Sequence, residues 1–175
     1  MNTLFLYLDF LGFSEISKDN KKTDDLFNII NNSHIQNDSN FKTIVFSDTL
    51  LAYNVYDDLN IEMKSIEIMY IIKLVQDIFK RLVDMNIFFK AIITEGEFTY
   101  KKLTNIESYY GQALIDTYKD EKDLTGTGLF LDKKLRKLNR IFLYYDYSDD
   151  YDYIFLTPNC RSLFLNIGDD KLDVS

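Results

Sequence analysis

The sequence has few of the residues that build covalent cross-links and thiolate or imidazole metal sites. Its single cysteine, Cys160, cannot form an intrachain disulfide, as is typical of proteins of the reducing cytoplasm. Its single histidine, His34, lies in the polar stretch NNSHIQND, and we interpret it as a solvated loop residue and not as a catalytic base. Metal sites that need several His or Cys ligands are therefore excluded.

Basic residues and long apolar runs are also scarce. There are 20 Lys and Arg residues against 28 Asp and Glu residues, and the net charge of −8 argues against binding to nucleic acid, which needs a basic face. The apolar N-terminal run has no basic start and is interrupted by Asp9, so it is not a signal peptide, and no run is long enough for a membrane-spanning helix. We therefore expect a cytoplasmic protein with no nucleic-acid or membrane partner.

Apolar side chains are plentiful: hydrophobic residues make up 46% and aromatic residues 15% of the 175 positions. This is enough for the core of one domain spanning residues 1–175. Alternating apolar runs predict strands at several places, and we expect Gly96 to mark a turn within one of them. These runs occupy residues 3–9, 41–56 (two strands around SDT), 87–100, 125–132, 141–147 and 151–157.

Helices are predicted between these strands. Thr23 is expected to cap a short one, Asn60 a long one that ends near residue 85, and another should follow Gly111. Residues 133–140 read as a short basic helix or a loop. Strands that alternate with helices, with several hairpins, predict an α/β (α+β) sandwich in which helices cover a mixed, mostly antiparallel sheet.

Two aspartates occupy strand ends in this scheme. Asp9 ends the first strand, and Asp48 lies at the tip of the predicted hairpin. If the strands are neighbours, the two carboxylates meet at one edge of the sheet. Carboxylate pairs without His or Cys favour Mg²⁺ or Mn²⁺ held partly by substrate phosphates, and two such ions serve displacement at phosphorus. Gly12 would let the intervening backbone approach a phosphate.

Four motifs in order strengthen this interpretation. LDFLGFS, FSDTLLAY, KAIITEG and YYGQALIDTYKDEKD resemble the motifs of the class III nucleotidyl cyclases, over roughly residues 4–132. The resemblance implies the ferredoxin-like cyclase fold and a site for two Mn²⁺ or Mg²⁺ ions. It assigns metal binding to Asp9, Asp48 and the main chain of Phe10. The triphosphate would be bound by Leu11, Gly12, Phe13, Ser14 and Lys90.

Other positions depart from the family's pattern. Lys119 stands where the family has its transition-state arginine, and is the expected catalytic cation although it cannot form a bidentate fork. Ile115 replaces the family's asparagine. Ile44 and Ser108 occupy positions that select the purine, and neither matches the adenylate pattern. With Tyr53 and Tyr110 they are the expected base pocket.

This compact form looks most like the pyrimidine cyclases of bacterial Pycsar anti-phage systems. That resemblance implies conversion of UTP or CTP to 3′,5′-cyclic UMP or CMP and pyrophosphate, by a homodimer with shared active sites. The product would activate a separate effector in antiviral defence. The alternatives are a catalytically weak cyclase-fold protein that binds a nucleotide or a partner, a purine cyclase, a wholly structural protein in which Asp9 and Asp48 are only cap residues, and a palm-type polymerase or diguanylate cyclase domain. The last is disfavoured because no GGDEF-like turn is present.

Overall fold

The computed structural model describes residues 2–33, 40–55 and 59–157. His34 and Cys160 lie outside these ranges, so the interpretations given for them stay predictions. Within the described residues, no helix combines the length and the hydrophobicity needed to cross a bilayer.

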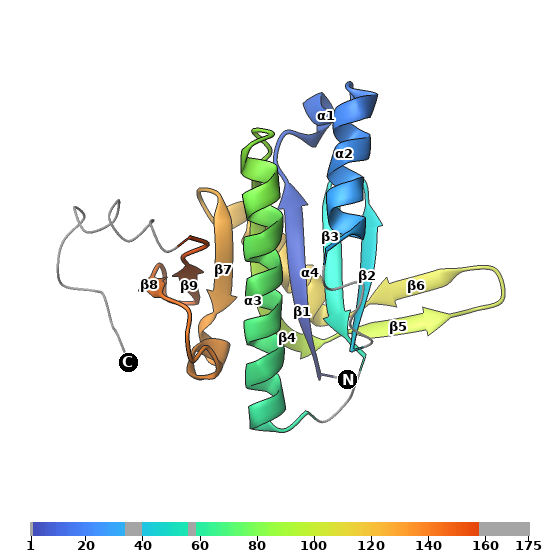
Figure 1. Cartoon of the computed structure of the whole chain (residues 1–175). Coiled ribbons are helices and arrows are strands. Elements are labelled where there is room, and N and C mark those ends of the chain that lie inside the picture. Colours follow the sequence, from blue (N-terminus) through green and yellow to red (C-terminus); the bar gives the residue numbers. More distant parts are fainter. Residues whose placement is uncertain (1, 34–39, 56–58, 158–175) are drawn as a thin grey trace.

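The centre of the molecule is a seven-stranded sheet (Figure 1). Every neighbouring pair in it is antiparallel except β4 and β7, which run parallel, so the predicted mixed and mostly antiparallel sheet is confirmed. The strand order is β2 (Phe41–Phe46), β3 (Thr49–Asn54), β1 (Asn2–Phe10), β4 (Phe89–Glu97), β7 (Gly128–Asp132), β9 (Tyr151–Ile154) and β8 (Tyr144–Asp146).

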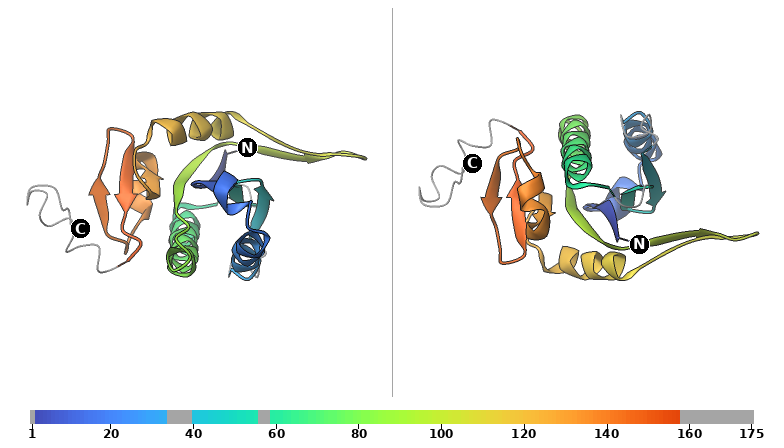
Figure 2. Two further views of the ribbon diagram at one scale, coloured as in Figure 1. Left: turned by 90° about the horizontal axis from the view of Figure 1, so that it is seen from above. Right: turned by 90° about the horizontal axis from the view of Figure 1, so that it is seen from below.

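Helices lie on both faces of this sheet, as Figure 2 shows from two directions. Helices α2 (Asn20–Asn31) and α3 (Ile61–Val83) cover one face, and α4 (Gln112–Asp123) covers the other. The side chain of Asn60 caps α3, as expected, by accepting a hydrogen bond from the amide of Met63. Helix α2 begins earlier than predicted, because Asp19 and not Thr23 is its cap.

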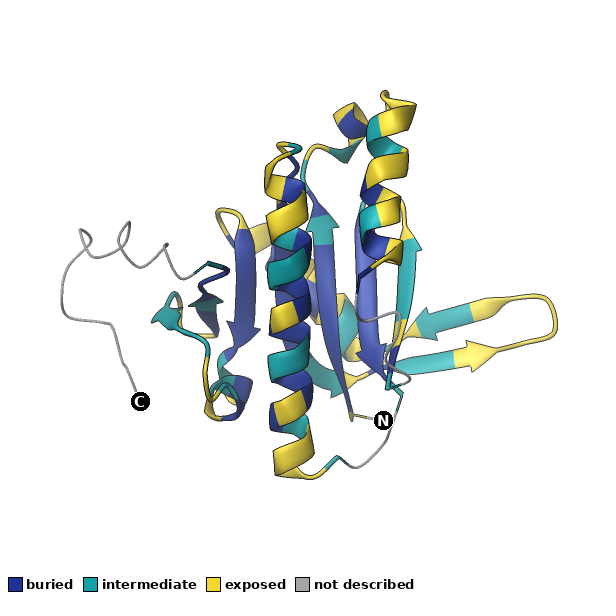
Figure 3. Ribbon diagram, viewed as in Figure 1, coloured by how far each residue is buried: buried dark blue, intermediate teal, exposed yellow. Residues whose placement is uncertain are grey.

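The alternation along β1 explains why both faces need cover. Leu4, Leu6 and Leu8 are buried against the apolar stripe of α3, whereas Phe5 and Tyr7 point to the opposite face and pack with aromatic residues there. Figure 3 shows the central strands of the sheet buried, the edge strands partly buried and the outer faces of the helices exposed. Asp9 follows Tyr7 on this second face, the one that carries α4.

The interpretation of Gly96 as a turn is wrong. Gly96 lies inside β4, and a Cβ atom there would come within 2.7 Å of the Cβ of Ala113. At the start of α4, Gly111 has φ 156°, and its Cβ would lie 2.1 Å from the main-chain oxygen of Glu97. Both glycines are therefore needed so that α4 can lie directly on β4.

The predicted strand at 87–100 continues past Gly96 into a second, two-stranded sheet. Its strands are β5 (Thr99–Lys102) and β6 (Glu107–Tyr110), which pair antiparallel and extend away from the body of the molecule in Figure 1. The strand β6 was not predicted from the sequence.

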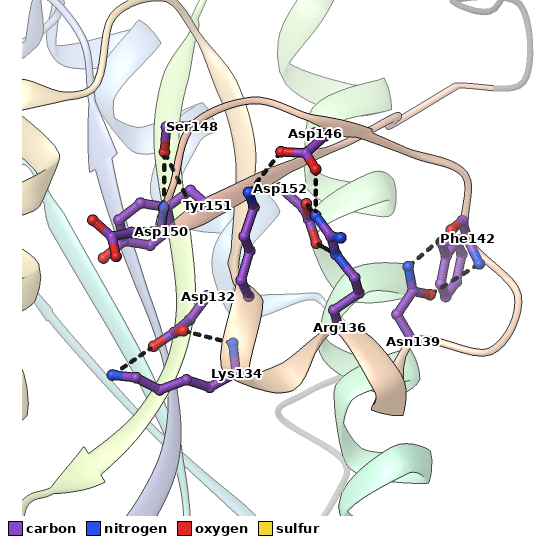
Figure 4. Close-up of polar contacts among 11 residues, drawn as sticks. Asp132, Lys134, Arg136, Asn139, Phe142, Asp146, Ser148, Asp150, Tyr151 and Asp152 are labelled. Carbon is purple, nitrogen blue, oxygen red and sulfur yellow. Dashed lines mark hydrogen bonds and ion pairs between the residues drawn. The ribbon is translucent and has the colours of Figure 1, made fainter. Parts of the chain in front are cut away.

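The edge of the sheet around β9 is held by an ion network (Figure 4). Residues 133–140 begin with a 3₁₀ helix, η2 (Lys133–Leu138), from which Arg136 donates two hydrogen bonds to Asp152 of β9. Asp152 is completely buried, and Arg136 also pairs with Asp146 of β8 at 3.1 Å. The network thus attaches η2 to the last two strands. A short helix, α1 (Phe13–Ile16), follows β1 directly.

Candidate active site

The structure brings Asp9 and Asp48 together at one corner of the sheet. Phe46 of β2 pairs with Thr49 of β3, so that Ser47 and Asp48 form the turn between these strands, with Ser47 at φ 52°. The amide of Phe10, next to Asp9, donates a hydrogen bond of 2.8 Å to the main-chain oxygen of Asp48. This bond fixes the hairpin turn against the end of β1, which is the juxtaposition that the sequence pattern indicated.

The carboxyl group of Asp9 experiences a strongly negative environment. Its pKa is raised from 3.8 to about 6, mainly by burial and then by the negative charges of Asp48 and Glu121, while the charge of Lys90 acts in the opposite direction. A carboxylate that is partly buried beside two others is stabilised by a bound cation. Perturbed acids of this kind cluster at functional sites.

Asp9 and Asp48 line a cavity of about 680 Å³ between the sheet and α4. Among the described residues, three acidic residues and one lysine contribute to its wall, and Ile115 and Tyr118 of α4 are both half exposed beside it. The lining residues are Tyr7, Asp9, Phe46, Ser47, Asp48, Thr49 and Leu51 from the sheet side and Leu114, Ile115, Tyr118, Glu121 and Lys122 from α4.

A metal ion in this corner would have few protein ligands. Within the described residues, no group of three or more His, Cys, Asp or Glu side chains is placed to hold an ion. The available donors are the carboxylates of Asp9 and Asp48 and nearby main-chain oxygens such as that of Phe10. All are hard oxygen donors, which suit Mg²⁺ or Mn²⁺ when water or phosphate supplies the other ligands.

The predicted triphosphate loop follows directly after β1. The amide of Leu11 is engaged, since it donates to the main-chain oxygen of Phe88 at 2.9 Å. Gly12 adopts the left-handed conformation with φ 70°, and α1 begins at Phe13. The first hydrogen bond of α1 runs from the amide of Glu15 to the main-chain oxygen of Gly12. The amides of Gly12, Phe13 and Ser14 come before this bond and therefore take no part in the hydrogen bonds within the helix.

Lys90 lies on β4 directly across from Asp9 in the strand register. Its amine lies 2.9 Å from a carboxylate oxygen of Glu121 and donates to the main-chain oxygen of the same residue at 2.6 Å. Glu121 was not predicted from the sequence to be a functional residue. The only signal was a glutamate in the last turn of an amphipathic helix, which is too common to be informative.

The remaining predicted site residues do not share this cavity. Lys119 is exposed on α4 and is not among the described lining residues. Tyr53 is buried with Phe98 at a ring-centroid distance of 4.9 Å and lines a separate cavity of about 160 Å³. Ile44 packs against the same cluster, Ser108 is half-buried on β6, and Tyr110 is exposed. Within one copy of the chain, the expected base pocket is thus not assembled around Asp9.

Comparison with known proteins identifies the fold. No family model and no curated sequence matches the chain. The adenylyl cyclase CyaB from P. aeruginosa is similar with a TM-score of 0.65 and 10% identity, over 88% of this chain and 93% of that one. The guanylyl cyclase Cya2 is similar with a TM-score of 0.58 and 9% identity, over 88% of this chain and 91% of that chain. A third similar structure is the guanylate cyclase domain of RhGC from Catenaria anguillulae, solved in complex with GTP. Its TM-score is 0.61 at 9% identity, over 88% of this chain and 96% of that chain.

The chain therefore has the fold of adenylyl and guanylyl cyclase domains, and the predicted fold class is confirmed. At 9–10% identity these likenesses establish the fold alone, so the chemistry has to be argued from the residues of this chain.

Proposed function

We propose that the protein is a nucleotidyl cyclase that converts a nucleoside triphosphate to a 3′,5′-cyclic nucleotide and pyrophosphate. The observation that carries this proposal is the meeting of Asp9 and Asp48 at one corner, beside a left-handed glycine and on the cyclase fold. A cavity wall with three acids and one lysine repels a polyphosphate unless cations are bound. The arrangement thus suits a substrate that arrives with divalent ions.

Two Mn²⁺ or Mg²⁺ ions are the proposed cofactors, held by Asp9, Asp48 and the main-chain oxygen of Phe10. When bound, they would supply charge neutralisation and activation of the attacking hydroxyl group. The raised pKa of Asp9 supports this role, because the opposing charge of Lys90 does not offset burial and the charges of Asp48 and Glu121.

The chain's own groups would bind and orient the substrate. The ribose 3′-oxygen attacks the α-phosphorus and gives up its proton to solvent water, while the bond from the α-phosphorus to the pyrophosphate oxygen breaks at the opposite side. The amides that follow Gly12 would receive negative charge on the leaving pyrophosphate, together with Lys90.

The proposed active form is a homodimer with shared sites. Phe46, Ile115 and Tyr118 are 50–60% exposed around the cavity, and a second copy would cover them. Lys119, exposed on α4, would then face the aspartates of the other copy. Ile44, Ser108 and Tyr110 would lie beside the base in this assembly, and the buried Tyr53 would support this pocket through packing.

We further propose a pyrimidine substrate, UTP or CTP, and a role in antiviral defence through a separate effector. The support is the sequence resemblance described above, in particular Ile44 and Ser108 in place of the residues that select adenine. A purine substrate is equally compatible with the fold, since the similar structures include both adenylyl and guanylyl cyclases.

The decisive experiment incubates the purified protein with Mn²⁺ and each of the four ribonucleoside triphosphates and identifies the products by mass spectrometry. The proposal predicts cyclic UMP or cyclic CMP as the main product, and its loss in Asp48→Ala. Cyclic AMP or GMP as the main product would refute the pyrimidine assignment. Binding of a triphosphate without any cyclic product would favour the second candidate, a nucleotide-binding protein, for which Ile115 in place of an asparagine is the supporting observation.

A further inference from the structure

Glu121 separates Lys90 from the cavity that contains Asp9. Among the described residues that line this cavity, Glu121 is present and Lys90 is not. The amine of Lys90 lies 2.9 Å from the Glu121 carboxylate and 2.6 Å from its main-chain oxygen. The two side chains are 11% and 12% exposed, so the amine that a phosphate would need is already covered.

The position of this ion pair makes it sensitive to a bound polyphosphate. Asp9 and Lys90 are directly opposite in the β1–β4 register, so their side chains leave the sheet on the same face. The charge of Glu121 is close enough to Asp9 to affect its pKa. A triphosphate bound at Asp9 would therefore attract Lys90 and repel Glu121 at short range.

The place of Glu121 in the helix makes a local displacement feasible. The start of α4 is pressed against β4 at Gly111, where there is no room for a Cβ atom. Glu121 lies at the other end, two residues before α4 ends at Asp123. The hydroxyl group of Tyr151 donates a hydrogen bond to Asp120 and Leu124 is buried, so the end of α4 is held in place. The exchange therefore requires only a rotation of the Glu121 side chain, which long side chains make between staggered rotamers.

We propose that Glu121 is a positioning residue that withholds Lys90 in the ligand-free protein and releases it to the triphosphate of an entering nucleotide. This inference rests on the proposed function for the place where phosphate binds. The proposed contact between α4 and β4 responds to substrate, because the triphosphate replaces the Glu121 carboxylate as the anionic partner of Lys90.

The test measures binding of inorganic tripolyphosphate in the presence of Mn²⁺ by calorimetry, so it does not depend on cyclase activity. The key variant is Glu121→Asp, which keeps the charge but withdraws the carboxylate from Lys90 by one methylene group. It should bind tripolyphosphate about fivefold more tightly or better, the lower end of the range for coupled sites. Lys90→Met should bind more weakly, and Glu121→Asp should bring no gain when combined with it.

A matched control is Glu95→Asp, which weakens another partly buried pair of the same strand, that with Lys64 at 2.5 Å. It should leave tripolyphosphate binding unchanged. The inference is overturned if Glu121→Asp binds no more tightly than the wild type, or if it gains equally without Lys90. Should Glu121→Asp not fold, as judged by thermal unfolding, Glu121→Gln gives the same expectation of tighter binding.

Failure of this inference is distinct from failure of the proposed function. If cyclic nucleotide is formed and Glu121→Asp binds no more tightly, the protein is a cyclase without this contact exchange. If tripolyphosphate binding responds as expected and no cyclic product is formed, the exchange is supported and the cyclase assignment is wrong.

Discussion

Replacing Asp9 with asparagine should stabilise the ligand-free protein at neutral pH, although it removes a group that the proposed reaction needs. The pKa of Asp9 rises from 3.8 to about 6 in the folded protein, first through burial and then through Asp48 and Glu121. At about 1.4 kcal/mol for each pKa unit, a fully buried carboxylate with this shift would lower the free energy of unfolding by about 3 kcal/mol. Because Asp9 is partly exposed and screened by solvent, we expect about 1–2 kcal/mol.

The direction of the pH dependence follows from the same values. The pKa of Asp9 is higher in the folded than in the unfolded state, so the folded state binds the proton more tightly. The carboxyl group therefore destabilises the fold progressively as the pH rises from 3.8 to about 6, and by a constant amount above that. The stability gain of Asp9→Asn should be full at pH 7.5 and nearly absent at about pH 4.

The assay is urea unfolding of the wild type and Asp9→Asn at both pH values, with a chelator present. Asp24→Asn, which changes an exposed carboxylate on α2, is the control and should alter the free energy of unfolding by less than about 0.5 kcal/mol. Mn²⁺ should then stabilise the wild type and not Asp9→Asn. A variant that is less stable than the wild type at pH 7.5 would refute the reasoning, since the carboxylate would then be stabilising the fold.

Three further substitutions test the packing of the fold, one of them as a comparison. Gly111→Ala should lower the free energy of unfolding by about 3 kcal/mol or more, measured in urea, because the new Cβ would meet the main-chain oxygen of Glu97 at 2.1 Å. Gly126→Ala, also at positive φ but with open space around it, should cost only about 1–2 kcal/mol. Arg136→Met should cost about 3–5 kcal/mol in the same assay, because it leaves the fully buried Asp152 without its main cation.

The outcomes that would contradict these expectations are specific. Equal losses for Gly111→Ala and Gly126→Ala would show that α4 does not rest on β4 as closely as described. A loss below about 1 kcal/mol for Arg136→Met, the range of exposed ion pairs, would mean that solvent compensates Asp152. In each case the m-value should stay unchanged, so that the comparison reports stability.

The parts of the fold set by local pattern could be predicted from the sequence. The alternation from Leu4 to Asp9 specifies a strand, and the short polar break at Ser47 specifies a hairpin with Asp48 in its turn. Asn60 and the apolar spacing after it specify α3. These signals depend on residues close in sequence, and they were sufficient to bring the two aspartates together.

The parts set by tertiary packing could not be predicted. Gly96 resembles a turn residue in the sequence, but its lack of a side chain serves the approach of Ala113 from α4. The pairing of Lys90 with Glu121 joins residues 31 positions apart, and depends on how α4 lies over β4. The aromatic residue Tyr53 was assigned to a base pocket, yet the structure places it in a buried cluster on the same face. Abundant tyrosines give no local signal that separates packing from recognition.

The central claim, that Asp9 and Asp48 form a single divalent-cation site, is tested most directly by electron paramagnetic resonance. Mn²⁺ is titrated into the wild type, Asp9→Asn and Asp48→Asn with a non-hydrolysable nucleoside triphosphate present, and the signal of free Mn²⁺ reports what remains unbound. We expect each single substitution to weaken Mn²⁺ binding by at least about tenfold, roughly 1.4 kcal/mol. Unchanged Mn²⁺ binding in either folded variant would contradict the account.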